Sequence, residues 1–288
     1  MHRVLLPFEF FEPKTVEEAV RLLDTANSKV MAGGVDLVLK MRLRLISPET
    51  VISLQKISGL DYIESNPAGL ILGALTSIRQ IELSSLVQKN WAVLYEAVRQ
   101  IASVQTKTMG TAVGNLCVGT PASDIASPLL VLGAKVKIAG IHYEKVVPIE
   151  NFFIGVGRTI LEPNEIVTEV FVPGVPAGTG SAFLKSAKTA DDIAKVNAAV
   201  MVTVTDKICK DVRIALGSVA PTPIRATEAE HALKGQRLDE TMFARAAEAA
   251  AEAVIPISDI RSTAQYRKEM VRVLVKDALV KATGNATA

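Results

Sequence analysis

The sequence lacks several features that would place it quickly in a known class of protein. Its 288 residues contain two cysteines, Cys117 and Cys209, and three scattered histidines, and no CxxC pair. This scarcity argues against an iron–sulfur or zinc site within the chain and for a reducing compartment. No apolar stretch approaches the roughly 20 residues that a membrane span needs. The opening MHRVLLPFEFF has too short an apolar run for a secretory signal, so a cytoplasmic protein is expected.

A strong charge of one sign is also absent, and so is a catalytic constellation. The 32 basic and 30 acidic residues leave a formal net charge of +2, which gives no electrostatic case for binding nucleic acid or an anionic membrane. No Ser-His-Asp set indicates a hydrolase. The adjacent Asp191 and Asp192 could be taken for catalytic carboxylates, but they fit a solvated turn. We therefore predict no catalytic residue and no metal ligand in this chain.

What the chain does contain is a succession of helical and strand patterns without an internal repeat. A capping-box pattern at Thr15 and Glu18 predicts a helix start, and GLDYIE followed by GLILGALTS predicts a hairpin. A Pro/Gly-rich passage at 173–180 marks a domain boundary. Beyond it, three segments alternate like antiparallel strands: SAFLKSAK, KVNAAVMVTVT and CKDVRIALGSV.

The order of these elements predicts an α+β protein with two α/β subdomains followed by a separate domain. The predicted subdomains span 1–58 and 59–175. The C-terminal domain, at 178–288, is expected to combine a three-stranded antiparallel sheet with helices.

The first of two small-residue loops, AGGVD at 32–36, falls between a predicted strand and a predicted helix. Glycines at Gly33 and Gly34 allow close backbone approach and positive φ, so that successive amide groups can converge on an anion. The same glycines also fit an ordinary β-to-α turn, and Asp36 also fits a simple helix start.

The second loop, KTMGTAVGN at 107–115, opens a small-residue stretch that is predicted to remain a loop as far as Pro128. Gly114 is followed by Asn115 and not by lysine, so the P-loop fingerprint is absent, and so is the G-x-G-x-x-G pattern. A loop this long inside a compact domain is usually functional, although a turn-rich connection stabilised by its own side chains is the alternative. Polar groups gather in this stretch at Thr111, Asn115, Thr120, Ser123 and Asp124.

Four segments, taken in order, resemble one protein family. AGGVDLVLKMRLRLISPETVISLQKISGL and MGTAVGNLCVGTPASDIASPLLVLGAKV resemble the first and second flavin-binding segments of the FAD-carrying medium subunits of molybdenum hydroxylases, a group that includes xanthine dehydrogenase and carbon monoxide dehydrogenase. LEPNEIVTEVFVP and FLKSAKTADDIAKVNAAV resemble the third and fourth. The resemblance covers nearly the whole chain from Phe8 onward. It implies the two-subdomain FAD-binding fold of the vanillyl-alcohol-oxidase (PCMH) type, followed by the C-terminal domain of the carbon monoxide dehydrogenase flavoprotein.

The resemblance also implies a set of FAD-binding residues. The backbone amides of the first loop would cradle the pyrophosphate: Ala32, Gly33, Gly34, Val35, Asp36 and Leu37. The second loop would supply the other clamp: Thr111, Ala112, Gly114, Asn115, Thr120 and Ser123. Asp124 would bond ribityl or ribose hydroxyls, and Lys185 would lie near the isoalloxazine. Apolar contacts with the adenine or flavin would come from Ile101, Ile166 and Val167.

The sequence departs from the family pattern most sharply at Val113, where the family often has glycine. If that position requires a positive φ, a β-branched residue is costly there. The family's Arg-Asn before the second loop is here Lys107-Thr108, and the basic residue usual after the Lys185 segment is here at best Lys188.

In function, the resemblance implies an FAD-binding electron-transfer subunit of a multisubunit molybdenum hydroxylase. Its partners would be a small subunit with [2Fe–2S] clusters and a large molybdopterin subunit, in a heterotrimer or its dimer, with NAD or another molecule as electron acceptor. One alternative is a self-contained FAD-dependent reductase or oxidase of the same fold. Another is a flavin-free scaffold subunit, with Val113 as the sign of a decayed site.

Overall fold

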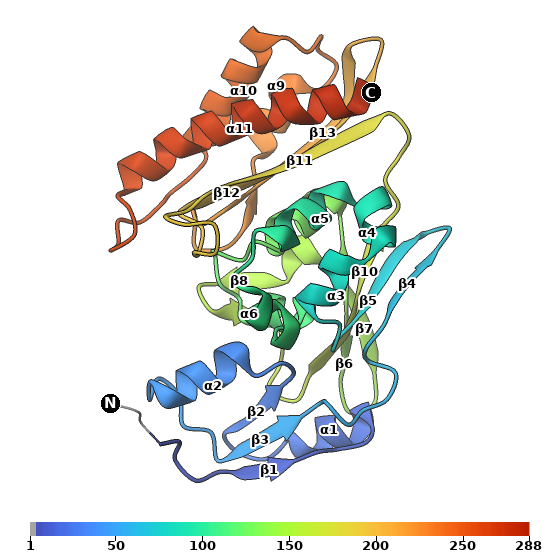
Figure 1. Ribbon diagram of the computed structural model, residues 1–288, viewed down its shortest axis with the longest axis vertical. Coiled ribbons are helices and arrows are strands. Elements are labelled where there is room, and N and C mark those ends of the chain that lie inside the picture. The colour runs from blue at the N-terminus through green and yellow to red at the C-terminus, as the bar shows by residue number, and fades with distance from the viewer. Residues whose placement is uncertain (1–3, 288) are drawn as a thin grey trace.

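The computed structural model of the chain describes residues 4–287, which form three units stacked along the long axis of the molecule (Figure 1). The first unit is a three-stranded parallel sheet in the order β1-β3-β2 with two helices. Its elements are β1 (Glu9–Phe11), α1 (Val16–Leu22), β2 (Ser28–Met31), α2 (Val35–Arg42) and β3 (Thr50–Ser53).

The predicted start of the first helix is confirmed at Thr15. The hydroxyl oxygen of Thr15 accepts a hydrogen bond from the Glu18 amide at 3.1 Å. The Glu18 carboxylate accepts from the amide of Lys14 at 2.9 Å rather than from that of Thr15. The helix therefore begins where the pattern places it, with the reciprocal bond shifted by one residue.

The second unit is built on a five-stranded antiparallel sheet in the order β4-β5-β10-β6-β7. Its strands are β4 (Ile63–Asn66), β5 (Gly69–Gly73), β6 (Lys135–Ala139), β7 (Glu144–Pro148) and β10 (Ile166–Pro173), with a small β8 (Phe153–Gly155) and β9 (Arg158–Thr159) pair alongside. The predicted hairpin is confirmed as β4 and β5. Its helices are α3 (Ile78–Leu83), α4 (Ser85–Asn90), α5 (Ala92–Arg99), α6 (Val104–Met109), α7 (Ala112–Cys117), α8 (Ala126–Leu132) and the 3-10 turn η1 (Ile149–Asn151).

The prediction of an unbroken loop over 110–128 is wrong, because this stretch contains α7 and the first turn of α8. Thr111 caps α7 by accepting from the amide of Gly114 at 3.0 Å. Val113 and Leu116 are buried in the core beneath it. Capping and burial stabilise this short helix, although its small residues have no helical periodicity of their own.

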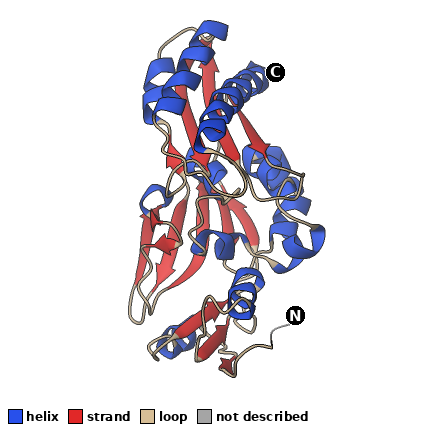
Figure 2. Cartoon of the chain, turned by 90° about the vertical axis from the view of Figure 1, so that its left-hand side faces the viewer, coloured by secondary structure: helices blue, strands red, loops and turns tan. Residues whose placement is uncertain are grey.

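The third unit is an antiparallel sheet in the order β11-β12-β13-β14, with helices α9, α10 and α11 against one face (Figures 1 and 2). The three predicted long strands are present, and β14 adds a fourth of two residues, too short to show alternation. The elements are β11 (Thr179–Ser186), β12 (Val196–Thr205), β13 (Ile208–Gly217), β14 (Ile224–Arg225), α9 (Thr227–Leu233), α10 (Glu240–Glu252) and α11 (Ala264–Thr287). None of the described helices is long and apolar enough to cross a membrane.

The strand β12 is shared between two hydrophobic cores. Ala198 and Val200 pack in the core of the third unit, under its helices. Ala199 and Met201, which point to the opposite face, pack in the core of the second unit with α5 and α8. Both faces of the strand are therefore covered, and the sheet forms the joint between the second and third units.

Candidate functional site

The two small-residue loops meet at Gly33. A Cβ atom added to Gly33 would overlap the backbone carbonyl oxygen of Met109 and lie 2.7 Å from the carbonyl carbon. Because both sides of this contact are backbone, no side-chain movement relieves it. Gly33 is therefore a glycine because the first loop packs directly on the second. The sequence predicted close approach here, and the partner proves to be the other loop.

Gly34 has a second and independent reason to be a glycine. Its φ of +74° is left-handed, and it is the N-cap residue of α2, where no side chain caps the helix. The first backbone bond of the helix joins the Val38 amide to the Gly34 carbonyl at 3.0 Å. The amides of Val35, Asp36 and Leu37 therefore precede the first intrahelical bond, at the positive end of the helix dipole. Such a terminus suits a phosphate group.

The loops border a cavity of about 880 Å³ between the first and second units. This volume lies within the range of about 300–1,000 Å³ typical of cofactor sites. The lining comes mainly from the β2–α2 loop, α2, α3 with its cap and the end of α6, with single residues after β3, on either side of the β4–β5 hairpin and before α7: Met31, Ala32, Gly33, Gly34, Val35, Val38, Leu39, Arg42, Gln55, Asp61, Leu75, Ser77, Arg79, Gln80, Leu83, Thr108, Met109 and Thr111.

Side chains far apart in the sequence brace this cavity. Gln55 donates to the Ala32 carbonyl at 3.0 Å and so supports the first loop. The second loop is pinned to the start of α3, where the Ile78 amide donates to the Gly110 carbonyl at 2.9 Å. Gln80 completes the capping box of α3 with Ser77. The sequence interpretation missed Gln55 and the Ile78–Gly110 contact because their partners come from separate elements and no local spacing links them. Ser77 and Gln80 do have the S-x-x-Q spacing of a capping box, a local signal that marks the start of α3.

A buried ion cluster lies behind the second loop. Glu82 accepts from Lys107 at 2.7 Å and from Arg79 at 2.6 Å, and the Lys107 side chain is only 5% exposed. Burial by itself raises the pKa of Glu82, but the hydrogen bonds from Lys107 and Arg79 outweigh it and hold this pKa below its usual value. Lys107, noted as a departure from the family pattern, thus anchors α6 to α3.

The positive φ that would make a valine costly at position 113 does not occur. Val113 lies within α7, is absent from the residues with positive φ, and has a side chain 3% exposed in the core of the second unit. A valine in a helix facing the core is unstrained and contributes apolar burial. The position therefore gives no sign of a decayed site.

The polar residues after the second loop form a buried network. The Ser123 hydroxyl donates to the Asn115 side-chain oxygen at 2.6 Å. The Lys185 ammonium lies 2.7 Å from the Asp124 carboxylate and donates to the Gln100 carbonyl at 2.8 Å. Burial raises the pKa of Asp124, while the Lys185 charge acts in the opposite direction. Thr120 lies on the same segment and accepts from the Ala122 amide at 3.3 Å.

Several of the predicted site residues do not line the cavity. Asp124 and Lys185 are buried against each other, with side chains 8% and 3% exposed. Ile101, Ile166 and Val167 are buried in the core of the second unit. The structure thus brings Ala32, Gly33, Gly34, Val35 and Thr111 together at the cavity, with Asp36 and Leu37 in the first turn of α2 beside it.

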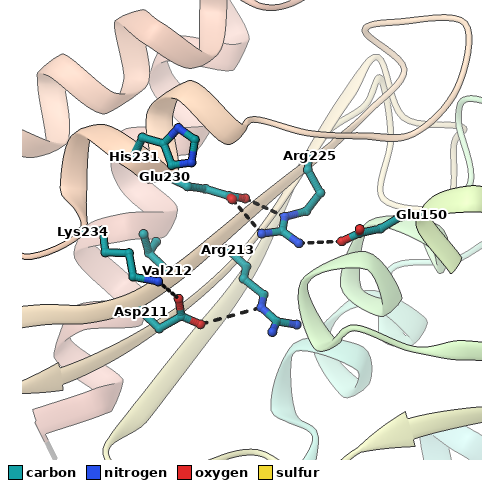
Figure 3. Close-up of a pocket in the computed structure, with 8 residues that line it drawn as sticks. All are labelled: Glu150, Asp211, Val212, Arg213, Arg225, Glu230, His231 and Lys234. Atoms are coloured by element: carbon teal, nitrogen blue, oxygen red, sulfur yellow. Dashed lines mark hydrogen bonds and ion pairs between the residues drawn. The ribbon is translucent and has the colours of Figure 1, made fainter. Parts of the chain in front are cut away.

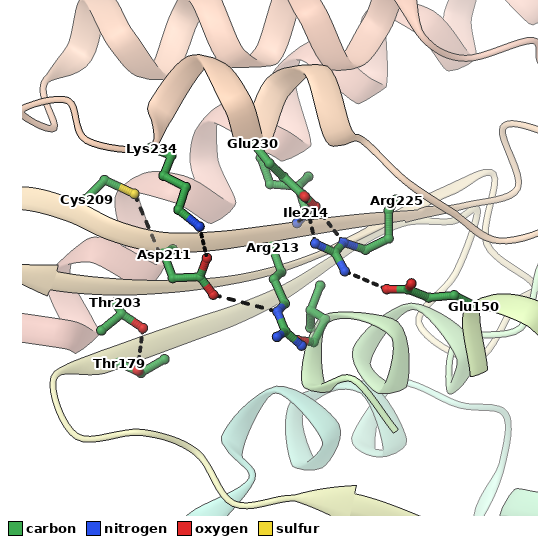
Figure 4. A network of polar contacts seen from close by, with 11 residues as sticks. Glu150, Thr179, Thr203, Cys209, Asp211, Arg213, Ile214, Arg225, Glu230 and Lys234 are labelled. Carbon is green, nitrogen blue, oxygen red and sulfur yellow. Dashed lines mark hydrogen bonds and ion pairs between the residues drawn. The ribbon is translucent and has the colours of Figure 1, made fainter. Parts of the chain in front are cut away.

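A second and smaller cavity of about 260 Å³ lies between the second and third units (Figure 3). Its lining is almost entirely charged: Glu150, Asp211, Val212, Arg213, Arg225, Glu230, His231 and Lys234. Arg225 donates to both carboxylate oxygens of Glu230 at 2.6 Å and to Glu150 at 2.7 Å (Figure 4). Lys234 pairs with Asp211 at 3.1 Å. Arg225 thus links the third unit to the second through Glu150, while the other two pairs lie within the third unit.

Comparison with known proteins yields two family matches. A family described as the FAD binding domain in molybdopterin dehydrogenase matches residues 6–175. The CO dehydrogenase flavoprotein C-terminal domain matches residues 181–282.

Relatives and solved structures match along nearly the full length. The carbon monoxide dehydrogenase medium chain of Hydrogenophaga pseudoflava is 34% identical over 274 residues, covering 94% of this chain and 96% of that one. The nicotine 6-hydroxylase medium subunit of Paenarthrobacter nicotinovorans is 32% identical, covering 95% and 96%. Among structures, carbon monoxide dehydrogenase from Hydrogenophaga pseudoflava superposes with a TM-score of 0.96 at 34% identity, covering 98% of this chain and 99% of that one. Quinoline 2-oxidoreductase from Pseudomonas putida 86 gives 0.94 at 27% identity, covering 99% and 100%.

Proposed function

Because this chain belongs to the family of FAD-binding medium subunits of molybdenum hydroxylases, we propose that it carries electrons within such a complex, from [2Fe–2S] clusters in a small partner subunit to NAD or another acceptor. A large molybdopterin subunit would oxidise the substrate. Relatives named as medium subunits of carbon monoxide dehydrogenase and nicotine 6-hydroxylase support this division of labour.

The residues at the large cavity fit FAD. Two backbone loops converge there, one of them at a helix start without a side-chain cap, and Arg42 lies among the lining residues. Main-chain amides and a nearby cation suit a pyrophosphate. We propose that Ala32 to Leu37 form the first clamp, with Thr111, Ala112, Gly114 and Asn115 in the second. When bound, FAD exchanges electrons with both one-electron and two-electron partners.

The remaining residues of the proposed site have supporting roles. Thr120, Ser123 and Asp124 continue from the second clamp, and Lys185 neutralises Asp124. We also propose that Ile101, Ile166 and Val167, in the core of the second unit, make the apolar contacts with the adenine or flavin. Within the chain, we propose 1–58 and 59–175 as the two FAD-binding subdomains and 178–288 as the C-terminal domain.

The observation that carries the proposal is the packing of the first loop on the second at Gly33, which places two polar backbone segments from different units beside one cavity. The two cysteines are unpaired in the structure, in keeping with a complex that works in the cytoplasm.

The test is reconstitution. The chain would be combined with candidate [2Fe–2S] and molybdopterin subunits from the same organism, and flavin absorbance would be followed anaerobically after substrate is added. Bleaching that needs all three subunits would support the proposal. Turnover of a small organic substrate by this chain alone would instead identify a self-contained reductase or oxidase. A colourless chain that takes up no added FAD would indicate a scaffold.

A further inference from the structure

Asn197 is a fully buried polar residue on the face of β12 that packs against the second unit. It has 0% exposure, and it alternates with Ala198, whose side chain lies in the core of the third unit. Its neighbours on the same face, Ala199 and Met201, belong to the core of the second unit. A buried amide in such a place must find hydrogen-bond partners.

Each end of the Asn197 amide has a defined partner. Its side-chain oxygen accepts from the Ser127 hydroxyl at 2.6 Å. Its nitrogen donates to one oxygen of Asp124 at 2.8 Å and lies 3.5 Å from the Ser123 carbonyl. An ionised carboxylate only accepts hydrogen bonds, so the nitrogen must face Asp124. The orientation of the amide is therefore determined by its surroundings.

The neighbouring strand leaves space for this amide. Gly217 of β13 is paired with Asn197 in the sheet register. A Cβ atom at Gly217 would lie 2.5 Å from the Asn197 side-chain oxygen and 2.7 Å from its nitrogen. Gly217 has no positive φ, so space is the reason for a glycine here. Asn197 and Gly217 form a matched pair.

From Asn197 the contacts lead to the second loop in two steps. The first step joins Asn197 to Ser123 and Asp124. In the second, the Ser123 hydroxyl donates to Asn115 at 2.6 Å and accepts from the Ala126 amide at 3.1 Å. The other oxygen of Asp124 receives Lys185. Side chains of β11 and β12 in the C-terminal sheet thus hydrogen-bond to the segment that follows the second loop.

We propose that Asn197, seated in the space left by Gly217, is a positioning residue for FAD binding: it fixes Ser123 and Asp124 and through them Asn115 in the second loop. The third unit then sets how tightly the cofactor is held, although it contributes no residue to the lining of the large cavity. This inference rests on the proposed function and adds to it a role for the C-terminal domain.

Asn197→Leu tests the role by removing both hydrogen-bonding ends. One Asp124 oxygen then loses its donor, and the segment 123–127 loses its side-chain hydrogen bonds to β12. We expect the FAD dissociation constant, measured by quenching of flavin fluorescence, to rise about 10- to 100-fold, which corresponds to the loss of a hydrogen bond to a charged group. The matched control is Asn285→Ala, which removes a bond to the Ser181 carbonyl in the same unit at an exposed site, and its affinity should equal that of the wild type.

Asn197→Asp keeps the shape of the side chain and should make FAD affinity depend on pH, an effect that general unfolding does not produce. The charged groups near this position are Asp124, Lys185 of β11, Glu96 of α5 and Arg267 of α11. When the new acid is protonated it donates to Asp124 as the amide did, and when it is ionised it repels Asp124. FAD affinity should approach the wild-type value at pH 5.5–6, taken as roughly the range where such a buried acid is protonated, and fall as the pH rises.

Gly217→Ala provides an independent route to the same effect by crowding the amide, and it should also weaken FAD binding. Equal FAD affinity in the wild type, Asn197→Leu and Gly217→Ala, all folded by circular dichroism, would overturn the inference and leave the proposed function intact. A pH profile of Asn197→Asp identical to that of the wild type would also overturn it. A wild-type chain that binds no FAD would defeat the proposed function, and the inference with it.

Discussion

The two cavities of this protein differ in whether the polar groups that border them already have hydrogen-bond or ion-pair partners within the chain. The larger cavity is bordered by backbone from two loops and by a helix start without a side-chain cap. The smaller one is lined by charged side chains, and Arg225 donates there to both Glu230 and Glu150 (Figure 4). A dense cluster of charges can therefore be a joint between units, whereas a ligand site has donors available to the ligand.

Physical chemistry explains why the charged cavity makes a poor cofactor site. Arg225 already donates to two carboxylates, so a bound anion would have to compete with Glu230 and Glu150 and repel them. At the larger cavity, the amides of Val35 to Leu37 precede the first intrahelical bond of α2. Within residues 4–287 no acceptor is bonded to these amides, so an anion there gains hydrogen bonds without displacing a partner from that part of the chain.

The largest expected effect comes from the buried pair beside the second loop. Lys185→Met leaves Asp124 buried without its cation and should lower the free energy of unfolding by about 3–5 kcal/mol. Urea denaturation at pH 7 measures this loss. Asp124 of the variant has a raised pKa in the folded state, so its carboxyl stabilises the fold below about pH 4, and this contribution is lost as the pH rises. The deficit should therefore grow from pH 4 to pH 7, and a deficit independent of pH would contradict the account.

Gly33→Ala should disrupt the contact between the loops. The added methyl group meets the carbonyl of Met109, and relief requires backbone movement, which typically costs about 1–3 kcal/mol. Because the same backbone borders the large cavity, FAD affinity measured by fluorescence quenching should fall by at least about tenfold.

A matched control for this change is Gly284→Ala, where the added methyl group meets nothing within 4 Å on a helix. It should leave FAD affinity unchanged. Equal affinity in both variants would show that the loop contact has no bearing on the cofactor.

Arg225→Met removes the central cation of the smaller cavity. Glu230, with a side chain 9% exposed, loses its partner, and since Arg225 is itself partly exposed we expect a loss of about 1–3 kcal/mol in unfolding free energy. FAD affinity should stay at the wild-type value, because the large cavity is elsewhere.

Glu150→Gln, at a half-exposed carboxylate, should lower the free energy of unfolding by less than about 1 kcal/mol. A strong loss of FAD affinity in either variant would reverse the comparison between the cavities.

The smallest expected effect concerns two thiols, that of Cys117 in α7 and that of Cys209 in β13. Burial raises the pKa of Cys117 from 9.0 to about 12. Burial and the Asp211 carboxylate raise that of Cys209 from 9.0 to about 11. Both thiols therefore stay protonated in the folded protein at pH 8 and should resist iodoacetamide until urea is added. Their raised pKa values stabilise the fold below pH 9, and that contribution is lost as the pH rises toward 11–12. Rapid alkylation of the folded chain would contradict this.

Much of the fold could be predicted from the sequence because local signals agreed with it. The Thr15 cap, the β4–β5 hairpin and the long strands of the third unit all carry their own patterns. Helix α7 was missed because AVGNLC owes its helical form to the Thr111 cap and to burial of Val113 and Leu116, which only the folded chain provides.

The candidate site was predictable only in part for a similar reason. Glycines in a loop indicate a backbone that needs space or a positive φ, so Gly33 and Gly34 could be predicted as special positions. The group that approaches Gly33, the Met109 carbonyl, depends on tertiary packing and could not be predicted. Gln55 and Arg79 reach the cavity from unrelated positions in the sequence. Asn197 likewise reads as one polar residue in an apolar strand until the structure shows Asp124 beside it.

We propose that FAD binds in the large cavity bordered by the two loops, and one titration tests this directly. Wild-type, Gly33→Ala and Arg225→Met chains would each be stripped of flavin and titrated with FAD under the same conditions. We predict one FAD per chain for the wild type, unchanged affinity for Arg225→Met and clearly weakened binding for Gly33→Ala. Retention of FAD by Gly33→Ala together with its loss from Arg225→Met would contradict the account and place the cofactor at the charged joint.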